Sequence, residues 1–411
     1  MKELISQWKK TFIILSLIFC MLLTSCTGAR ELDTLGIVIA VGIDIENGKI
    51  IVTNEVINPA SGKESKTASS QDNTLFVQGI GNTVEEAIIN TTLTFDRRLY
   101  YPHNYLVILG EEFAKAGISE HIDILSRGKE QREQAYMLVA KGTRACDVMG
   151  INSGISKSSG RYIYQIIEED IYNGQTRTIT INEFLKYHFK EREEYILGVV
   201  RPIEKPQINK NKTEDKIQVI CVEGGAVFKE DTLVGYYMGD EMLGFNFLID
   251  DLKMANISFE SPKYLQKNHN LISEKGSLSS VEIFRSKTKK SLKVIDGRLH
   301  LFIDVEFRGL LAEETQGIDI SKPGMIREME KACGEKVKSH IANVMNKAQK
   351  EFGIDTFGIG ELVHRKYPKL WKEIKDNWSQ VFVDLDYTIN VKAHINDTGF
   401  TNTPPNIRKD K

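Results

Sequence analysis

Residues 35–57 read LGIVIAVGIDIENGKIIVTNEVI, and this stretch decides how the chain begins to fold. Two apolar runs, 35–45 and 49–57, flank the dipeptide Asn47-Gly48. A type I′ turn needs positive φ at both central positions, which Asn and Gly adopt readily, and its twist matches that of two antiparallel strands. The stretch therefore predicts a β-hairpin.

Helix-start signals and short apolar runs alternate downstream of the hairpin. Thr83 with Glu86, and Thr180 with Glu183, have capping-box spacing, so each pair predicts the first turn of a helix. Strands are predicted at residues 75–77, 105–109 and 136–140, and residues 59–73, which lack apolar periodicity, are predicted to form a long loop. This alternation predicts a mixed α/β domain over residues 26–200, which could comprise two subdomains.

A change in composition marks the second half. Residues 201–216 (RPIEKPQINKNKTEDK) combine prolines with many charges and predict a linker. Alternating apolar residues from Leu299 to Phe307 predict a strand with one buried face, and an apolar residue at every third or fourth position from Ile326 to Phe352 predicts a long helix lying on it. A last alternating strand is predicted from Val381 to Ile395.

These signals predict a C-terminal α+β domain over residues 217–396 and a flexible tail over 397–411. The whole chain is then a mixed α/β (α+β), multi-domain soluble body with largely antiparallel sheets packed by helices. This soluble body is predicted to lie behind a cleaved lipoprotein signal.

The N-terminus has the layout of an export signal. Lysines precede the apolar run 11–23, which at ~1.5 Å per residue reaches only about 20 Å, short of the ~30 Å hydrocarbon core. Thr24 and Ser25 precede Cys26, as in a bacterial lipobox, so residues 1–25 are predicted to be a lipoprotein signal peptide and Cys26 the diacylated first residue of the mature protein. Two acyl chains suffice for stable anchoring to the outer face of a membrane. The alternative is an ordinary secretory signal with an incidental cysteine.

Composition excludes several classes of function. A net charge of −2 argues against a nucleic-acid-binding surface, and 41% hydrophobic residues are ordinary for a globular protein. Beyond Cys26 the cysteines are Cys146, Cys221 and Cys333, an odd number without CxxC spacing, so free buried thiols are predicted. The histidines show no metal-ligand spacing, and no GxSxG elbow or P-loop is present. We expect no enzyme active site, no metal and no cofactor.

Two basic stretches remain as candidate interaction sites. His364, Arg365 and Lys366 lie beside an aromatic residue and could contact a partner, but a structural histidine or a phosphate-facing surface is the alternative. The basic run at residues 285–293 is first of all a solvated sheet face or edge guard, with a lipid-contacting patch as the alternative.

Motifs along nearly the whole mature chain resemble the Ger(x)C family of spore germination lipoproteins, the C subunits of germinant receptors. In the first half these are Arg30-Glu31-Leu32, Ala40 to Asp44, Arg97-Arg98-Leu99 ahead of His103, Leu106 to Glu112, Gly117-Ile118, Glu130-x-Arg132 and Val139 to Gly142. In the second half they are Ala226 to Lys229, Leu233-Val234-Gly235, Asp355-x-Phe357-Gly358, His364 to Lys369 with Trp371, and Trp378. The chain departs from the family pattern at Thr27-Gly28, Pro102 and Arg127-Gly128.

The resemblance implies a non-enzymatic, lipid-anchored subunit that assembles with integral-membrane A and B subunits on the outer face of the spore inner membrane. Such a receptor triggers germination in response to nutrients. The alternative is a solute-binding lipoprotein that serves a transporter, which also needs an anchor and a soluble body. Antiparallel hairpins and one-sided strands favour the first interpretation, because solute-binding proteins usually have two lobes rich in βαβ units.

Overall fold

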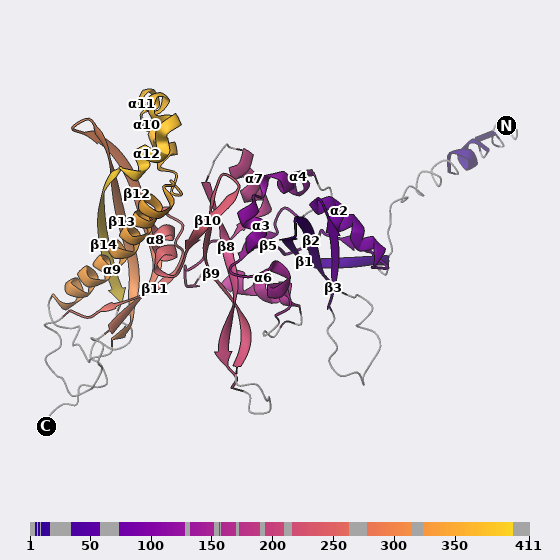
Figure 1. The fold of residues 1–411 in the computed structure, drawn as a ribbon, viewed down its shortest axis with the longest axis horizontal. Helices are drawn as coiled ribbons and strands as arrows, with labels where there is room; N and C mark the ends of the chain where they lie inside the picture. Colours follow the sequence, from indigo (N-terminus) through magenta and orange to yellow (C-terminus); the bar gives the residue numbers. More distant parts are fainter. Residues whose placement is uncertain are drawn as a thin grey trace.

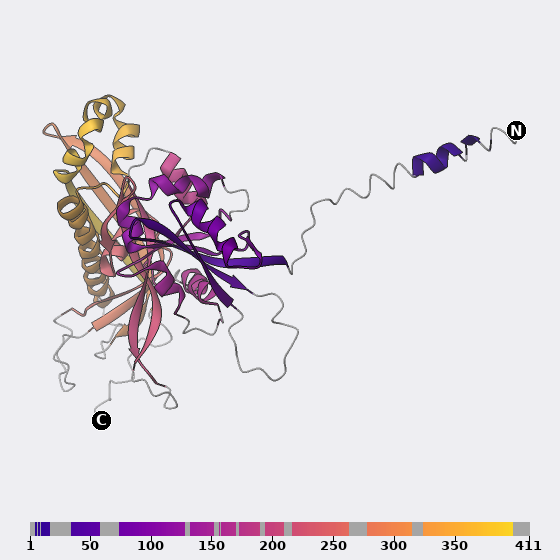
Figure 2. The same ribbon diagram turned by 45° about the vertical axis from the view of Figure 1, so that its right-hand side comes forward.

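The computed structural model describes residues 5, 7–8, 10–16, 34–57, 74–127, 132–151, 156, 158–169, 172–189, 194–208, 216–262, 278–314 and 324–397. Within these residues the chain forms two β-sheets with helices packed against both (Figures 1 and 2). The predicted mixed α/β class is confirmed. The predicted loop at 59–73 and the tail after residue 397 lie outside the described residues.

The first sheet has ten strands in the order β10-β9-β8-β6-β5-β1-β2-β3, with β4 paired to β1 and β7 to β6. Its strands are β1 (Leu35–Glu46), β2 (Lys49–Ile57), β3 (Thr74–Gly81), β4 (Arg98–Tyr100), β5 (Leu106–Gly110), β6 (Tyr136–Ala140), β7 (Ile179–Thr180), β8 (Glu194–Pro206), β9 (Lys216–Lys229) and β10 (Thr232–Tyr237). The central strands β1, β5, β6 and β8 pair in parallel, and antiparallel hairpins extend the sheet on both sides. The sequence did not predict this parallel centre.

The predicted hairpin is confirmed as β1–β2. Its register closes at Glu46 and Lys49 around a two-residue turn in which Asn47 has φ 51° and Gly48 φ 73°. These positive values are the ones a type I′ turn requires. The strands predicted at 105–109 and 136–140 are found as β5 and β6.

Helices cover both faces of the first sheet. They are α2 (Val84–Asn90), η3 (Thr91–Leu93), α3 (Glu111–Ala116), α4 (Ser119–Arg127), α5 (Ala145–Met149), α6 (Ser159–Glu169) and α7 (Ile181–Phe189). Residues of α2, α3 and α7 belong to the hydrophobic core on one face, and residues of α5 and α6 to the core on the other. The predicted capping boxes are present, since Thr83 Oγ1 accepts from Glu86 N at 3.1 Å and Thr180 Oγ1 from Glu183 N at 3.3 Å.

Two buried carboxylates tie helices to this sheet. Asp44 on β1 accepts from the N–H of Ala145 at 2.7 Å, at the start of α5. Glu55 on β2 accepts from the N–H of Gly160 at 2.7 Å, at the start of α6. The first N–H groups of a helix have no acceptor within the helix, and they carry partial positive charge, so a strand carboxylate satisfies both needs. Burial nevertheless raises the pKa of both carboxyls above the ordinary range.

The linker predicted at 201–216 is wrong in its described part. Residues 201–206 belong to β8 and pair with 216–221 of β9, in a hairpin that projects from the body (Figure 1). Charges and Pro206 are tolerated there because residues 204–206 and Lys216, in the outer part of the hairpin, are exposed. β9 and β10 also extend the first sheet, so the change from one sheet to the next follows Tyr237 and not residue 216.

The second sheet has four strands in the order β11-β12-β13-β14. They are β11 (Ala255–Glu260), β12 (Leu278–Ile295), β13 (Arg298–Glu314) and β14 (Asp386–Asp397). The accompanying helices are α8 (Asp240–Leu248), α9 (Met325–Lys347), η6 (Ala348–Phe352), α10 (Ile359–Lys366), α11 (Pro368–Ile374), η7 (Lys375–Asn377) and α12 (Trp378–Val383).

The long helix predicted at 326–352 is confirmed as α9, continued to Phe352 by a π-helical turn, and its apolar stripe packs on the second sheet. The start predicted for the last strand is wrong. Val381 and Val383 lie in α12, and β14 begins at Asp386. Trp378 and Phe382, four residues apart, are buried on one side of α12, and this helical spacing overrides the chance alternation of valines.

Part of the first sheet packs into the hydrophobic core of the second half. Tyr237, at the end of β10, is fully buried, and its ring stacks on Phe245 of α8 at 5.8 Å between centroids. Its hydroxyl lies 3.1 Å from Thr356 Oγ1. Ile196 of β8 and Val227 of β9 belong to the same core cluster as α8, α9 and the second sheet. The halves are therefore joined by packing as well as by the chain.

Candidate functional site

Cys26, the predicted lipidation site, lies outside the described residues, and its modification stays a prediction. Residues 10–16 of the predicted signal segment are helical. None of the helices in the described ranges is long and apolar enough to cross a bilayer.

The predicted interface residues lie on α10, which a buried carboxylate holds in place. Asp355 is 6% exposed and accepts hydrogen bonds from the backbone N–H of Phe357 and Ile359, both at 3.1 Å, and of Gly360 at 2.6 Å. The indole Nε1 of Trp378 donates a fourth bond at 3.1 Å. Gly358 turns the chain into the helix with φ 70°, a value that favours glycine. Asp355, Phe357, Gly358 and Trp378 are motif residues of the family resemblance, and their role here is to build this corner.

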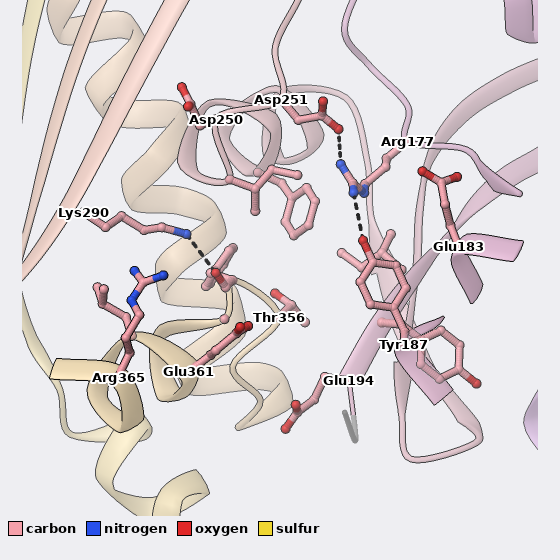
Figure 3. A pocket seen from close by; sticks show the side chains of 17 residues that line it. Arg177, Glu183, Tyr187, Glu194, Asp250, Asp251, Lys290, Thr356, Glu361 and Arg365 are labelled. Atoms are coloured by element: carbon pink, nitrogen blue, oxygen red, sulfur yellow. Dashed lines mark hydrogen bonds and ion pairs between the residues drawn. The ribbon is translucent and has the colours of Figure 1, made fainter. Parts of the chain in front are cut away.

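His364, Arg365 and Lys366 occupy the last turn of α10 and are exposed, but they do not form one basic surface. The ring of His364 stacks on Trp371 with centroids 5.8 Å apart. Lys366 Nζ donates to the carbonyl oxygen of Leu292 on β12 at 2.6 Å. Arg365 instead lines a groove between the two halves, where Figure 3 shows it beside Glu361. The structure thus gives the three residues three different surroundings.

Both halves of the protein build a groove beside α10. A hollow of about 600 Å³ is lined from the first half by residues of α7 and β8, among them Tyr187 and Glu194, and from the second by Lys290, Glu361 and Arg365 (Figure 3). A second hollow of about 750 Å³ shares Glu194 and Glu361 with it and extends to His364 and Trp371. A third, of about 640 Å³, shares Arg177 and Asp251 and continues along α7. The three form one surface groove along the junction.

Charged side chains bridge and line this groove. Arg177 pairs with Asp251 across the junction, and its other guanidinium nitrogen lies 3.4 Å from Tyr187 Oη (Figure 3). Lys290 Nζ donates to the carbonyl oxygen of Phe357 at 2.8 Å, which fastens the turn before α10 to β12. The groove thus carries side chains of both charge signs, and the Arg177–Asp251 ion pair joins the two halves.

The described residues contain no group of three or more His, Cys, Asp and Glu that could hold a metal. The thiols of Cys146, Cys221 and Cys333 are free, as predicted, although only Cys333 is fully buried. Burial raises the pKa of Cys146 to about 11 and that of Cys333 to about 12, so both thiols stay protonated and unreactive at neutral pH.

Sequence reasoning singled out His364, Arg365 and Lys366 but predicted neither the helix α10 that carries them nor the groove. Arg177, Lys290 and Asp251 come from separate segments, and no local pattern connects them. Other motif residues prove to be structural: Asp44 caps α5, and Glu111 accepts from the N–H of Gly142.

Comparison with known proteins identifies two adjoining domain families. Residues 28–202 match the spore germination protein N-terminal domain, and residues 223–399 match the family described as spore germination B3/GerAC like, C-terminal. The chain is 26% identical to spore germination protein KC of Bacillus subtilis (strain 168) over 95% of its own length and 96% of that protein. It is 21% identical to spore germination protein B3 of the same strain over 95% of its length and 99% of that protein.

The fold is also that of a solved structure. The crystal structure of the GerBC protein matches with a TM-score of 0.54 and 20% identity, covering 87% of this chain and 96% of that one. Both halves, their order and their common fold therefore lead to one conclusion: the chain belongs to the Ger(x)C family of spore germination proteins.

Proposed function

We propose that this protein is the C subunit of a spore germinant receptor, anchored through diacylated Cys26 to the outer face of the spore inner membrane. There it assembles with the integral-membrane A and B subunits and is required for germination in response to nutrients. The observation that carries the proposal is the match of both halves to spore germination domain families, over residues 28–202 and 223–399.

The proposed role is non-enzymatic. It is supported by the protonated thiols of Cys146 and Cys333, and by a groove whose Arg177 and Lys290 are engaged in bonds within the protein. A subunit of this kind acts by stabilising one conformation of the receptor, to an extent set by its difference in affinity for the two states. Arg365 and His364, exposed at the groove and its extension, are the proposed partner-contact residues of α10, with Lys366 as the residue that fixes the helix to the sheet.

The anchor is tested by substitution of one cysteine. Cys26→Ala is expected to abolish incorporation of a fatty-acid analogue and to release the protein from the membrane, whereas Cys221→Ala, which changes a half-buried thiol, should label like wild type. Labelling of Cys26→Ala at the wild-type level would refute the anchor. Deletion of the gene should abolish germination through this receptor, and affinity purification of the tagged protein from spore membranes should recover the A and B subunits.

A solute-binding role is the second candidate, because the hollow lined by Tyr187, Lys290 and Arg365 has a volume of about 600 Å³, which is the size of a small-molecule site. The receptor proposal expects no saturable binding of amino acids, sugars or nucleosides by this subunit alone. Calorimetry of the purified protein with the receptor's own germinant separates the two. Saturable binding in the micromolar range would favour the solute-binding role.

A further inference from the structure

Three large apolar side chains lie exposed at one end of the first half. Leu93 in η3 is 79% exposed, Ile89 in α2 is 57% exposed and Leu75 in β3 is 54% exposed. Single exposed apolar residues are ordinary, but a group of them on one surface marks a contact with a partner or a membrane. These three are used by no feature described so far.

Local packing brings Leu93 towards Leu75, and Ile89, four residues before Leu93, lies on the same side of the helix as Leu93. A Cβ at Gly79 or Gly81 of β3 would collide with the backbone of α2, so the helix lies directly on that face of the strand. Leu75 is on the same face, because it lies four positions before Gly79 and six before Gly81, and side chains alternate between the faces of a strand. The helix runs antiparallel to β3, because Gly81 lies against Ala87 whereas Gly79 also lies against Thr91. The C-terminal end of the helix, with Leu93, therefore approaches the start of the strand and Leu75.

The chain from the predicted anchor enters the body at this same end. Leu35, at the start of β1, pairs with Arg98 of β4, and the ring of Phe95 covers Gly36, only two residues along the chain from Leu93. In Figure 1, α2 and β3 lie on the side of the body away from the second sheet. Cys26 precedes Thr34 by eight residues, which span at most about 29 Å when fully extended.

We propose that Leu75, Ile89 and Leu93 rest on the lipid bilayer, so that the anchored body stands on this end. The inference relies on the lipid anchor of the proposed function. A short tether turns the contact into an intramolecular event with a high effective concentration, so a few apolar side chains suffice to orient the body. An added β-strand fits less well, because Asn90 Nδ2 already donates to the carbonyl oxygen of Ile80 on β3 at 2.7 Å.

The test places a fluorescent reporter on the surface. The lipidated full-length protein carrying Leu93→Trp is reconstituted into vesicles of phosphatidylglycerol and phosphatidylethanolamine, with and without bromine on the acyl chains. Bromine quenches tryptophan only at close range. Of the native tryptophans, Trp8 lies in the predicted signal peptide, which the mature lipidated protein lacks, and Trp371 and Trp378 lie in the second half. Ile295→Trp, at a 43% exposed site in the second half, is the matched control.

The emission added by Leu93→Trp is expected to fall by at least half in brominated vesicles, that of Ile89→Trp likewise, and that of Ile295→Trp to stay unchanged. Equal emission in both kinds of vesicle, or equal quenching at all three sites, would overturn the inference. Flotation of the vesicles is measured in parallel. Protein that does not float contradicts the anchor and this surface together, whereas protein that floats without quenching contradicts only the surface.

Discussion

Replacing Asp355 should destabilise the second half and disorder the helix that carries Arg365. In Asp355→Ala the N–H groups of Phe357, Ile359 and Gly360 and the indole N–H of Trp378 lose their common acceptor. A buried donor left without a partner costs ~1–3 kcal/mol. The four costs do not add, because the glycines flanking Ile359 allow water to reach some of the donors. We expect a loss of about 3–5 kcal/mol in unfolding free energy.

The assay is thermal or denaturant unfolding followed by tryptophan fluorescence, since Trp371 and Trp378 pack against each other beside Asp355 with centroids 5.5 Å apart. At ~2–4 °C per kcal/mol for a domain of this size, the midpoint should fall by about 10 °C. Asp355→Asn keeps one acceptor oxygen and should lie between wild type and Asp355→Ala. Trp378→Phe removes only the indole donor.

Asp376→Ala is the matched control, because that carboxylate lies nearby in η7 but has an 88% exposed side chain. It should change the unfolding free energy by no more than ~0.5 kcal/mol. If Asp355→Ala unfolds at the same midpoint as Asp376→Ala, the four hydrogen bonds do not hold this corner and the reasoning fails.

Three further outcomes follow from the structure. Asn54 is fully buried and its side-chain amide has no hydrogen-bond partner among the described residues, so Asn54→Leu should raise the unfolding free energy by about 1–2 kcal/mol, and a lower midpoint would show a hidden partner. Burial raises the pKa of Glu55 above its ordinary 4.5, so the folded state keeps a proton that the unfolded chain releases. The unfolding free energy then falls as pH rises from about 4.5 towards the folded pKa, and in Glu55→Gln this dependence should flatten; an unchanged slope contradicts the assignment. Chelator and reductant should leave the unfolding midpoint unchanged, because the described cysteines are free thiols, and a shift with either reagent would reveal a missed site.

Signals that act over a few residues were sufficient to predict individual elements. Asn47-Gly48 sets a turn whose geometry depends on its own two residues, and the alternation in β13 and the stripe of α9 record which side of each element is buried. The prediction that the last strand starts at Val381 was wrong because alternation of apolar residues over a few positions also fits a short helix with apolar residues on most sides. The wrong linker has a similar cause, since a projecting hairpin has the composition of a loop.

The groove could not be predicted because its chemistry is built from distant segments. Arg177 and Asp251 are 74 residues apart in sequence, and the fold alone brings them together. Likewise, the sequence placed His364, Arg365 and Lys366 side by side, but a helix turns each by about 100° from the last, so neighbours in sequence face different surroundings. Only the fold shows that Lys366 donates a hydrogen bond to the carbonyl oxygen of Leu292, whereas Arg365 lines the groove.

Tyr237 and the residues around it make the two halves behave like the subunits of an obligate heterodimer that happen to be covalently linked. A gene cut between the two domain families, after residue 202 and before residue 223, would part the paired strands β8 and β9 and would remove Ile196 of β8 from the core cluster that contains α8. The first fragment would lose strands β9 and β10 of its sheet, and the second would lose the part of its core that β8 supplies. In the intact chain the same packing couples the two ends of the body. If the body moves rigidly, a tilt of the end that carries β3 rotates α10 at the other end by the same angle.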